Sequence, residues 1–312
     1  MFTRILTPLD GSEQSENAIP LAATLARASG GTVILARVEE IPAAYSPAFA
    51  PPMGADFIDA EHEESVAYLE RTRNLPALRG VMVETDTVAG APALTLLGVI
   101  AAKHADLVVM TSHGRTGLSR WVLGSVAQHI AHDSPVPVLV LRASGGVPAM
   151  TSADDRQRLP VLVPLDGSPL AEEALTPAAQ LLTAIMPHGE LHLTLIVTPL
   201  QAIVENMPDA LVMEGAKVYL RERAERLERE WPGLSVTWSV GVGVDPAEAI
   251  LREAQGADGR RCGAIAMATH ARSGMSHWAF GSVTERVLHG ATLPLLIVRP
   301  AQTIRSHVAG RP

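Results

Sequence analysis

Short apolar runs rich in β-branched residues alternate with longer stretches of helical periodicity along both halves of the chain. In the first half, apolar runs predict five strands, at residues 4–9, 32–38, 81–88, 106–111 and 137–142, and helical patterns start near Glu13, Asp56, Ala91 and Ser125. Several runs are apolar at nearly every position, which is typical of parallel strands covered by helices on both faces. The pattern therefore predicts an α/β fold.

The whole pattern occurs twice. The stretch RILTPLDGSEQSENAIPLAA at residues 4–23 returns as PVLVPLDGSPLAEEALTPAA at residues 160–179, and LGSVAQHIAHDSPVPVLVLR returns as FGSVTERVLHGATLPLLIVR. Self-similarity over this length indicates a duplication. We therefore predict two domains, at residues 1–145 and 159–301, joined by a small, polar linker at 146–158 and followed by a tail at 302–312.

Composition narrows the choice of partners. The 312 residues are 47% hydrophobic and 19% charged, with a formal charge of −8 spread over both halves, so a nucleic-acid partner is not expected. No apolar run approaches the ~20 residues of a spanning helix, and the N-terminus reaches Asp10 before a signal-peptide core could form, so a membrane is not expected either. The single Cys262 rules out an internal disulfide and fits a reducing cytoplasm.

Two unusual loops follow predicted strands. The sequence DGS follows the first strand, and SHGRTG follows the fourth. In open parallel sheets, ligands bind outside the carboxyl ends of the strands, where the strand order reverses. If the first and fourth strands are neighbours, both loops flank one crevice.

These motifs together resemble the universal stress protein family. PLDGS closes the first strand, TSHGRTGLSRWVLGSV follows the fourth and PVLVLR forms the last, and the second half repeats all three. The resemblance implies two tandem doubly wound, open, parallel five-stranded sheets of order 3-2-1-4-5, with helices on both faces. It also implies that the last strands pair as an intrachain pseudo-dimer, while a homodimer of whole chains stays open.

The ligand implied by the resemblance is ATP, bound through a Gly-x2-Gly-x9-Gly-Ser/Thr signature. Glycines let backbone N–H groups approach phosphate oxygens, and the closing Gly-Ser starts a helix whose first amides favour an anion. The first half has Thr111, Gly114 and Gly124-Ser125 at these positions, whereas the second has Ala268, Ala271 and Gly281-Ser282. We therefore expect the first domain to hold the stronger nucleotide site, with any Mg²⁺ held mainly by the phosphates.

The resemblance extends to the remaining site residues. For the first domain it implies nucleotide contacts from Pro8, Leu9, Asp10, Val38, Thr111, Gly114, Arg115, Gly124, Ser125 and Val126. For a weaker second site it implies Pro164, Leu165, Asp166, Val197, Ala268, Ala271, Arg272, Gly281, Ser282 and Val283. Asp10 and Asp166 have an alternative role as helix caps, and Ser125 and Ser282 are expected to be N-caps in any case.

Three classes of function follow. The first is an ATP-binding regulatory protein of the stress response, the second a scaffold that acts through unknown protein partners, and the third an ATP-cleaving enzyme. The motifs supply no metal-binding carboxylate pair, no P-loop lysine and no activated nucleophile. The regulatory binder therefore ranks first, the scaffold second, and ATP turnover is expected to be slow or absent.

Overall fold

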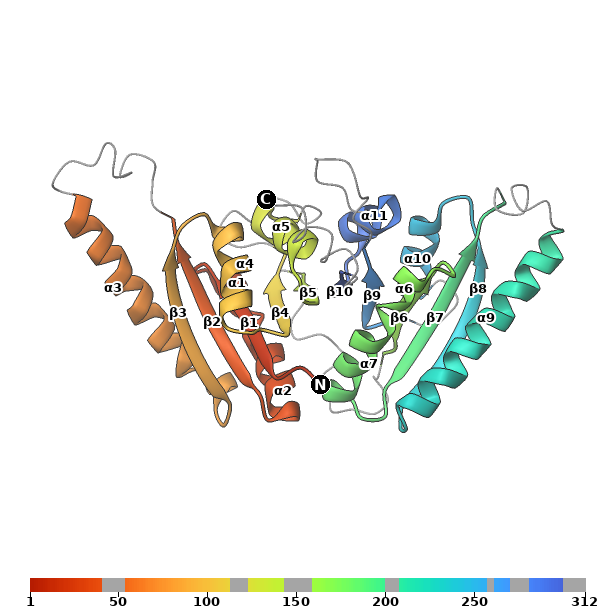
Figure 1. Cartoon of the computed structure of the whole chain (residues 1–312), viewed down its shortest axis with the longest axis horizontal. Coiled ribbons are helices and arrows are strands. Elements are labelled where there is room, and N and C mark those ends of the chain that lie inside the picture. Colours follow the sequence, from red (N-terminus) through yellow and green to blue (C-terminus); the bar gives the residue numbers. More distant parts are fainter. Residues whose placement is uncertain are drawn as a thin grey trace, which may run out of the picture. The chain divides into compact units, whose positions relative to one another are not determined.

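The chain divides into two α/β units, Met1–Gly146 and Val147–Pro312 (Figure 1). The structure is a computed structural model that describes residues 1–40, 54–112, 123–142, 159–199, 208–256, 261–269 and 281–299. The predicted linker at 146–158 and tail at 302–312 lie outside the described residues. Each unit is therefore considered by itself.

The first unit has the predicted sheet. Its described elements are β1 (Arg4–Leu9), α1 (Glu13–Glu16), α2 (Ile19–Ser29), β2 (Thr32–Glu39), α3 (Gly54–Arg73), the 3-10 helix η2 (Pro76–Leu78), β3 (Met82–Ala89), α4 (Pro92–Ala102), β4 (Leu107–Thr111), α5 (Ser125–Asp133) and β5 (Val138–Leu141). All neighbouring strands are parallel, in the order β3-β2-β1-β4-β5. The order 3-2-1-4-5 is confirmed, and the strand boundaries differ from the predicted ones by a residue or so.

The second unit repeats this arrangement. Its described elements are β6 (Val161–Leu165), α6 (Pro169–Glu172), α7 (Leu175–Ile185), β7 (Glu190–Val197), α9 (Asp209–Glu230), β8 (Ser235–Val242), α10 (Pro246–Ala254), β9 (Ala264–Ala268), α11 (Ser282–Gly290) and β10 (Leu295–Val298). The strand order β8-β7-β6-β9-β10 corresponds strand for strand to the first sheet. The duplication seen in the sequence is thus a duplication of structure.

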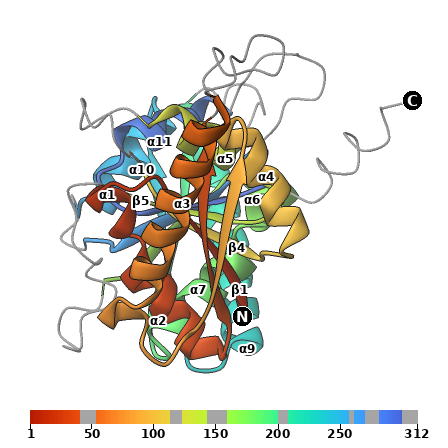
Figure 2. The same ribbon diagram turned by 90° about the vertical axis from the view of Figure 1, so that its left-hand side faces the viewer.

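Helices cover both faces of each sheet. Right-handed crossovers place α2 and α3 on one face of the first sheet, because both connect strands that progress in one direction, and place α4 and α5 on the other. Figure 1 shows α3 running along β2 and β3, and Figure 2 shows α2 and α3 on one side of the sheet with α4 on the other. In the second unit, α10 and α11 pack on each other as α4 and α5 do.

Burial follows the position of each strand. Every residue of the interior strand β4 is buried, whereas the edge strand β3 is half-buried along most of its length and carries Glu84 and Asp86. Charged side chains on an edge strand discourage pairing with another chain. The core of the first unit is formed by aliphatic side chains between sheet and helices, with Ile5, Leu25 and Ile34 fully inaccessible to solvent.

The helix expected to start near Glu13 is broken in two. After α1 ends at Glu16, the amides of Asn17 and Ala18 donate to the carbonyls of Gln14 and Ser15, which is a tighter i→i−3 pattern. Pro20 has no N–H that could continue an α-helical ladder back to Glu16. The break sends α2 across the sheet, while α1 stays at the carboxyl end of β1.

The hydrogen-bonded register of the first strand with the fourth ends before the carboxyl edge of each sheet. Strand β1 pairs with β2 along its whole length, from Arg4 to Leu9, but its register with β4 comprises only Ile5 with Leu107 and Leu6 with Val108. Beyond these pairs lies Pro8, which has no N–H to donate to a neighbour. In the second sheet the register of β6 with β9 is equally short, and Pro164 follows it. In each sheet the ladder therefore ends early where the strand order reverses.

Candidate functional site

A tight turn connects β1 to α1. The Asp10 carboxylate oxygen Oδ1 accepts hydrogen bonds from the Ser12 amide at 3.0 Å and the Ser12 hydroxyl at 2.6 Å, and Gly11 between them has φ of 84°. The left-handed conformation explains the glycine. Ser12, and not Asp10, is the N-cap of α1, since its hydroxyl accepts from the Ser15 amide at 3.2 Å.

The turn after β6 is built in the same way. Asp166 Oδ1 accepts from the Ser168 amide at 2.9 Å, Gly167 has φ of 82°, and Ser168 caps α6 by accepting from the Ala171 amide at 3.1 Å. The helix cap considered for the two aspartates is therefore supplied by the two serines. Both aspartates fix the turn through one carboxylate oxygen.

The helices after β4 and β9 begin at glycines. Gly124 and Gly281 are the N-caps of α5 and α11, so Ser125 and Ser282 are the first helical residues, and their expected role as N-caps is wrong. The cap is decided by backbone angles, and Gly124 has the extended values of φ −60° and ψ 151°. Because glycine has no side chain to accept a hydrogen bond, the amides of residues 125–127 precede the first intrahelical bond, which runs from Gln128 to Gly124.

The first unit contains a cavity of about 570 Å³ at the carboxyl ends of β1, β2 and β4. It is lined by Pro8, Leu9, Asp10, Ser15, Ala36, Arg37, Val38, Glu40, Glu61, Pro92, Leu96, Met110, Thr111, Ser112, Gly124, Ser125, Val126 and Ala127. Every predicted first-site residue that the structure describes is in this lining. Gly114 and Arg115 lie outside the described residues.

The polar groups of the first cavity are divided between two sides. Hydroxyl groups of Thr111, Ser112 and Ser125 stand with the first amides of α5, whereas the carboxylates of Glu40 and Glu61 come from the end of β2 and from α3. The β4 and α5 side therefore offers hydrogen-bond donors to an anion, and the β2 and α3 side offers two carboxylates together with the Arg37 guanidinium.

Arg37, Glu40 and Glu61 were not expected at the site. Arg37 is buried, and its guanidinium lies over the Tyr68 ring at 5.1 Å from the centroid. The Tyr68 hydroxyl donates to Glu16 at 3.0 Å, and burial together with the nearby Glu16 carboxylate raises the Tyr68 pKa to about 12. The only sequence signal for Arg37 and Glu40 was the presence of charged residues near the end of an apolar strand.

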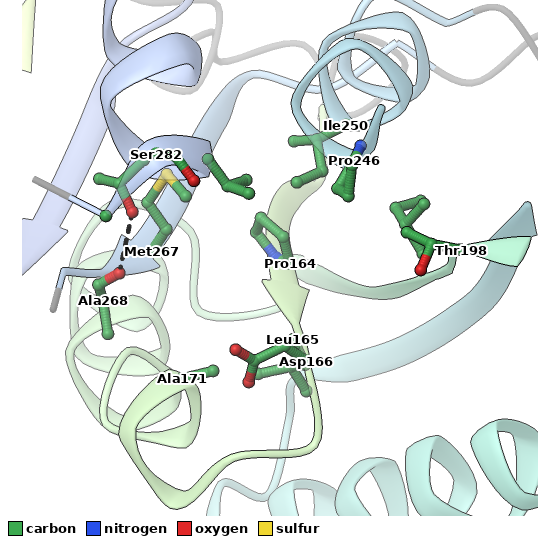
Figure 3. A pocket seen from close by; sticks show the side chains of 14 residues that line it. Pro164, Leu165, Asp166, Ala171, Thr198, Pro246, Ile250, Met267, Ala268 and Ser282 are labelled. Atoms are coloured by element: carbon green, nitrogen blue, oxygen red, sulfur yellow. Dashed lines mark hydrogen bonds between the residues drawn. The ribbon is translucent and has the colours of Figure 1, made fainter. Parts of the chain in front are cut away.

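The second unit contains a matching cavity of about 420 Å³ (Figure 3). It is lined by Pro164, Leu165, Asp166, Ala171, Ile196, Thr198, Pro246, Ile250, Met267, Ala268, Gly281, Ser282, Val283 and Thr284. Seven of the predicted second-site residues are in this lining, namely Pro164, Leu165, Asp166, Ala268, Gly281, Ser282 and Val283. Ala271 and Arg272 lie outside the described residues.

The sequence analysis treated Val197 as the equivalent of Val38, but Val197 is one position too far along its strand. Leu9 is in register with Arg37 in the first sheet, and its counterpart Leu165 is in register with Leu195 in the second. The residue equivalent to Val38 is therefore Ile196, and Ile196 lines the cavity. The sequence comparison missed this because the chain between the first two strands differs in length between the halves.

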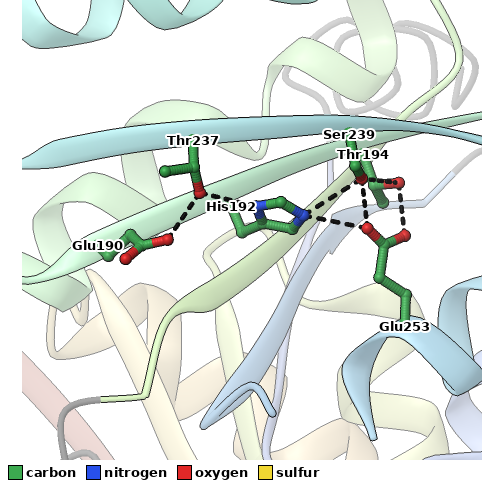
Figure 4. A network of polar contacts seen from close by, with 6 residues as sticks. All are labelled: Glu190, His192, Thr194, Thr237, Ser239 and Glu253. Atoms are coloured by element: carbon green, nitrogen blue, oxygen red, sulfur yellow. Dashed lines mark hydrogen bonds and ion pairs between the residues drawn. The ribbon is translucent and has the colours of Figure 1, made fainter. Parts of the chain in front are cut away.

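A buried polar network lies against helix α10 in the second unit (Figure 4). The carboxylate of Glu253, on α10, accepts from the Thr194 hydroxyl at 2.6 Å, lies 3.0 Å from His192 Nε2 and is hydrogen-bonded by the Ser239 hydroxyl. On its other side, His192 Nδ1 lies 2.7 Å from the Thr237 hydroxyl. Burial alone raises the pKa of Glu253, but hydrogen bonds from His192, Ser239 and Thr194 outweigh it and hold the pKa below its usual value.

The network fixes a wall of the second cavity. Pro246 and Ile250 of α10 line the cavity, and Glu253 lies one helical turn beyond Ile250 on the same helix. At the start of α10, Asp245 caps the helix by accepting from the amides of Ala247 and Glu248, and it pairs with Arg286 of α11. The wall is thus anchored at both ends.

Fold and cavities together define a tandem α/β protein with a ligand-sized cavity at the switch point of each parallel sheet. The chain belongs to the universal stress protein family, whose model matches residues 1–142 and again residues 158–299. The resemblance noted in the sequence is thereby confirmed.

Individual relatives extend over nearly the whole chain. A universal stress protein of Mycolicibacterium smegmatis is 28% identical over 302 residues, which cover 95% of this chain and 97% of the relative. The crystal structure of a universal stress protein from Archaeoglobus fulgidus superposes with a TM-score of 0.69 at 20% identity, covering 95% of this chain and 98% of that one. A universal stress protein structure from Pseudomonas aeruginosa gives a TM-score of 0.57 at 17% identity, covering 99% and 98%. At these identities the two structures show the shared tandem fold.

Within the described residues, no helix has both the length and the apolar character needed to cross a bilayer. The described part of the chain also holds no cluster of three or more His, Cys, Asp or Glu side chains arranged for a metal ion.

Proposed function

We propose that this chain is an ATP-binding regulatory protein of the stress response, with ATP bound in the first cavity. One observation carries the proposal: a cavity of about 570 Å³ ends at a helix whose N-cap is a glycine, so that amides with no side-chain cap among the described residues and three hydroxyl groups adjoin one space. A helix N-terminus of this kind attracts phosphate through its amides and its dipole.

The lining fits the parts of ATP in order. Pro8, Val38 and Leu96 form apolar walls that suit an adenine ring. The Asp10 carboxylate can accept hydrogen bonds from ribose hydroxyls, which are donors. Thr111 and Ser125, with the amides of residues 125–127, would hold the phosphates, and a Mg²⁺ ion would be held mainly by the phosphates themselves.

The acidic side of the cavity favours one orientation of the ligand. Glu40 and Glu61 carry two negative charges against the one positive charge of Arg37, so this side repels a triphosphate on balance, and the phosphates are directed toward α5 and the base toward β2. Electrostatics and shape therefore select the same orientation.

The proposal includes slow or absent ATP turnover. No lysine or histidine is among the described lining residues, Arg37 is on the side proposed for the base, and Asp10 Oδ1 is engaged by the turn that it closes. Phosphoryl transfer needs charge neutralisation and a positioned base or water at the phosphates. The carboxylates of Glu40 and Glu61 are on the side that suits the base, which favours a binding role.

Co-purification and titration test the proposal. Ligand extracted from freshly purified protein should be identified by mass as an adenine nucleotide, and calorimetry should then be repeated on Gly124→Asp and Gly281→Asp. A carboxylate at the cap of α5 should reduce ATP affinity more than about 100-fold, since it replaces an attractive site with a repulsive one. The matched Gly281→Asp change should leave first-site affinity unaltered. Absence of nucleotide and of any ATP titration would favour the scaffold instead.

A further inference from the structure

Charged side chains that line the first cavity from its second strand have uncharged counterparts in the second unit. The sheet register places Leu195 at the position of Arg37 and Thr198 at the position of Glu40. Leu195 is buried, and Thr198 lines the second cavity with an uncharged hydroxyl group. The β7 side of the second cavity has therefore exchanged a guanidinium and a carboxylate for an alkyl group and a hydroxyl group.

The long helix shows the same kind of replacement. Tyr68 of α3 and Tyr219 of α9 are equivalent, because each donates to the last residue of the short helix that follows the first strand of its unit. Counting seven residues back from each tyrosine, Val212 occupies the position of Glu61. With these changes, Asp166 is the one charged side chain among the described residues that line the second cavity, and it is exposed to solvent.

The inner wall of the second cavity is apolar and buried. Leu165, Ile250, Met267 and Ala268 all line it and are each at most 7% exposed. In Figure 3 the side chains of Pro164, Ile250 and Met267 face one space. Apolar ligand surface that is removed from water against such a wall contributes about 25 cal/mol per Å².

The polar groups that remain do not require a charged ligand. The buried Thr284 hydroxyl donates to the Ala268 carbonyl at 3.4 Å and is thus used within the protein. Ser282 is exposed and can be hydrated. The first amides of α11 follow its N-cap Gly281, and water or a single ligand oxygen can accept from them. A ligand of this cavity therefore needs much apolar surface and few polar groups.

We infer that the second cavity binds an uncharged, mainly apolar molecule of fused-ring size, with no phosphate and at most one or two hydrogen-bonding oxygens. A charged ligand would have to shed water against this wall, where only the exposed Asp166 among the described lining residues carries a charge. The volume of about 420 Å³ is within the range of small-molecule sites, which are mostly apolar with a few polar groups. The inference concerns a different cavity and a different ligand class from the proposed ATP site.

The two cavities can be blocked separately in the full-length chain. Leu96→Trp fills the first cavity and Ile250→Trp fills the second, because the two residues are the fifth of α4 and of α10. If circular dichroism shows that either change disturbs folding, Glu40→Trp and Thr198→Trp replace them as a matched pair, since both residues line their cavities without being fully buried.

Probes that share one ring system and differ in charge test the ligand class. The uncharged 1-naphthol, the anion 1-naphthyl phosphate and the cation 1-naphthylmethylamine are titrated by calorimetry into the Leu96→Trp chain, with adenosine and ATP alongside. 1-Naphthol should bind, and both charged probes should bind at least about tenfold more weakly. Adding Ile250→Trp to this chain should reduce its affinity for 1-naphthol at least about tenfold.

A matched exchange at one lining position sharpens the test. Thr198→Val, in the Leu96→Trp background, removes the hydroxyl group and should leave 1-naphthol affinity within about twofold or raise it. Thr198→Glu introduces the carboxylate found at this position in the first cavity and should reduce 1-naphthol affinity about fivefold or more.

The outcomes separate this inference from the proposed ATP site. The inference is overturned if the Leu96→Trp chain binds adenosine, ATP or a charged naphthalene more tightly than 1-naphthol. It is also overturned if 1-naphthol does not bind, or if its binding survives Ile250→Trp. A chain with only the second cavity filled that fails to bind ATP would overturn the proposed function alone.

Discussion

Helix α4 of the first unit and the equivalent helix α10 of the second unit are held to their sheets by opposite arrangements of charge. In the first unit the carboxylate is on the strand, where Asp86 lies 3.5 Å from Lys103 just beyond α4. In the second unit the register places Ser239 at the position of Asp86, and the carboxylate is on the helix, as Glu253. The two repeats have kept backbone and apolar walls while changing the polar partners behind them.

The two arrangements also differ in exposure. The side chains of Lys103 and Asp86 are 31% and 24% exposed, whereas those of His192 and Glu253 are 10% and 13% exposed. A pair in contact with water is worth little, but a buried carboxylate with several donors is costly to disrupt. The contact behind the second cavity should therefore stabilise its unit more than the equivalent contact behind the first.

The largest expected effect comes from truncating the buried carboxylate. Glu253→Ala should destabilise the second unit by about 2–3 kcal/mol, because three donors lose their acceptor in a buried place. Asp86→Ala is the matched change and should cost about 0–1 kcal/mol. Hydrogen exchange read by mass spectrometry on peptides of β7 and β2 assigns each loss to its unit. Equal losses would remove the proposed difference between the arrangements.

Mild acid should remove only part of the stabilisation that Glu253 contributes to the second unit. The pKa of folded Glu253 lies below the ordinary value of 4.5, so its stabilising contribution is complete above that value and is lost as the pH falls through the lower folded-state pKa. The urea midpoint of the second unit should therefore fall between pH 5.5 and pH 3.5. This fall should be smaller than the fall in midpoint that Glu253→Ala causes.

Tryptophan fluorescence can follow that midpoint. Trp231 and Trp238 are in the second unit and report on it once Trp121 and Trp278 are replaced by Phe. Glu253→Gln removes the titrating group and should flatten the dependence on pH. A slope that survives this change would assign the acid sensitivity to another group.

A smaller effect, equal in the two units, is expected for a hydrogen bond that both units contain. Tyr219 donates to Glu172 at 2.9 Å, as Tyr68 donates to Glu16 at 3.0 Å. Tyr68→Phe and Tyr219→Phe should each cost about 1 kcal/mol, the usual value of one hydrogen bond. Urea denaturation measures both, and a large difference between them would show that the second unit's Arg223, which also contacts Glu172, changes the contribution of the tyrosine.

Salt should have the smallest effect. The half-exposed pair of Lys103 and Asp86 is screened by added ions, so Lys103→Ala should cost less than about 1 kcal/mol at low salt. That cost should disappear in 0.5 M NaCl, where the screening length is on the order of 4 Å. A cost that persists at high salt would indicate that the lysine stem contributes through packing.

Local patterns predicted the strands, because each strand is a contiguous apolar run whose burial is set by its own residues. The strand order came from the family resemblance, since periodicity within a run contains no information on its neighbours. The N-caps were misplaced by one residue, because Gly124 and Ser125 are both acceptable at a helix start and backbone angles decide between them. The network around Glu253 joins residues from three elements and could not be deduced from any one of them.

The residues that line the cavities could be predicted only in part, because sequence motifs connect some of them and not others. Pro8, Asp10 and Thr111 are adjacent to strand ends and carry recognisable motifs, so their convergence follows from a parallel sheet. Glu40 and Glu61 reach the same space from β2 and from α3, which no motif connects.

The early end of the ladder between the first and fourth strands has a consequence for the cost of binding. Because Pro8 and Pro164 lack an N–H, neither ladder can be extended through them toward the carboxyl edge. This end of the ladder is fixed by covalent structure and does not depend on a ligand. A ligand at this edge therefore breaks no backbone hydrogen bond donated by Pro8 or Pro164, which favours affinity without any added contact.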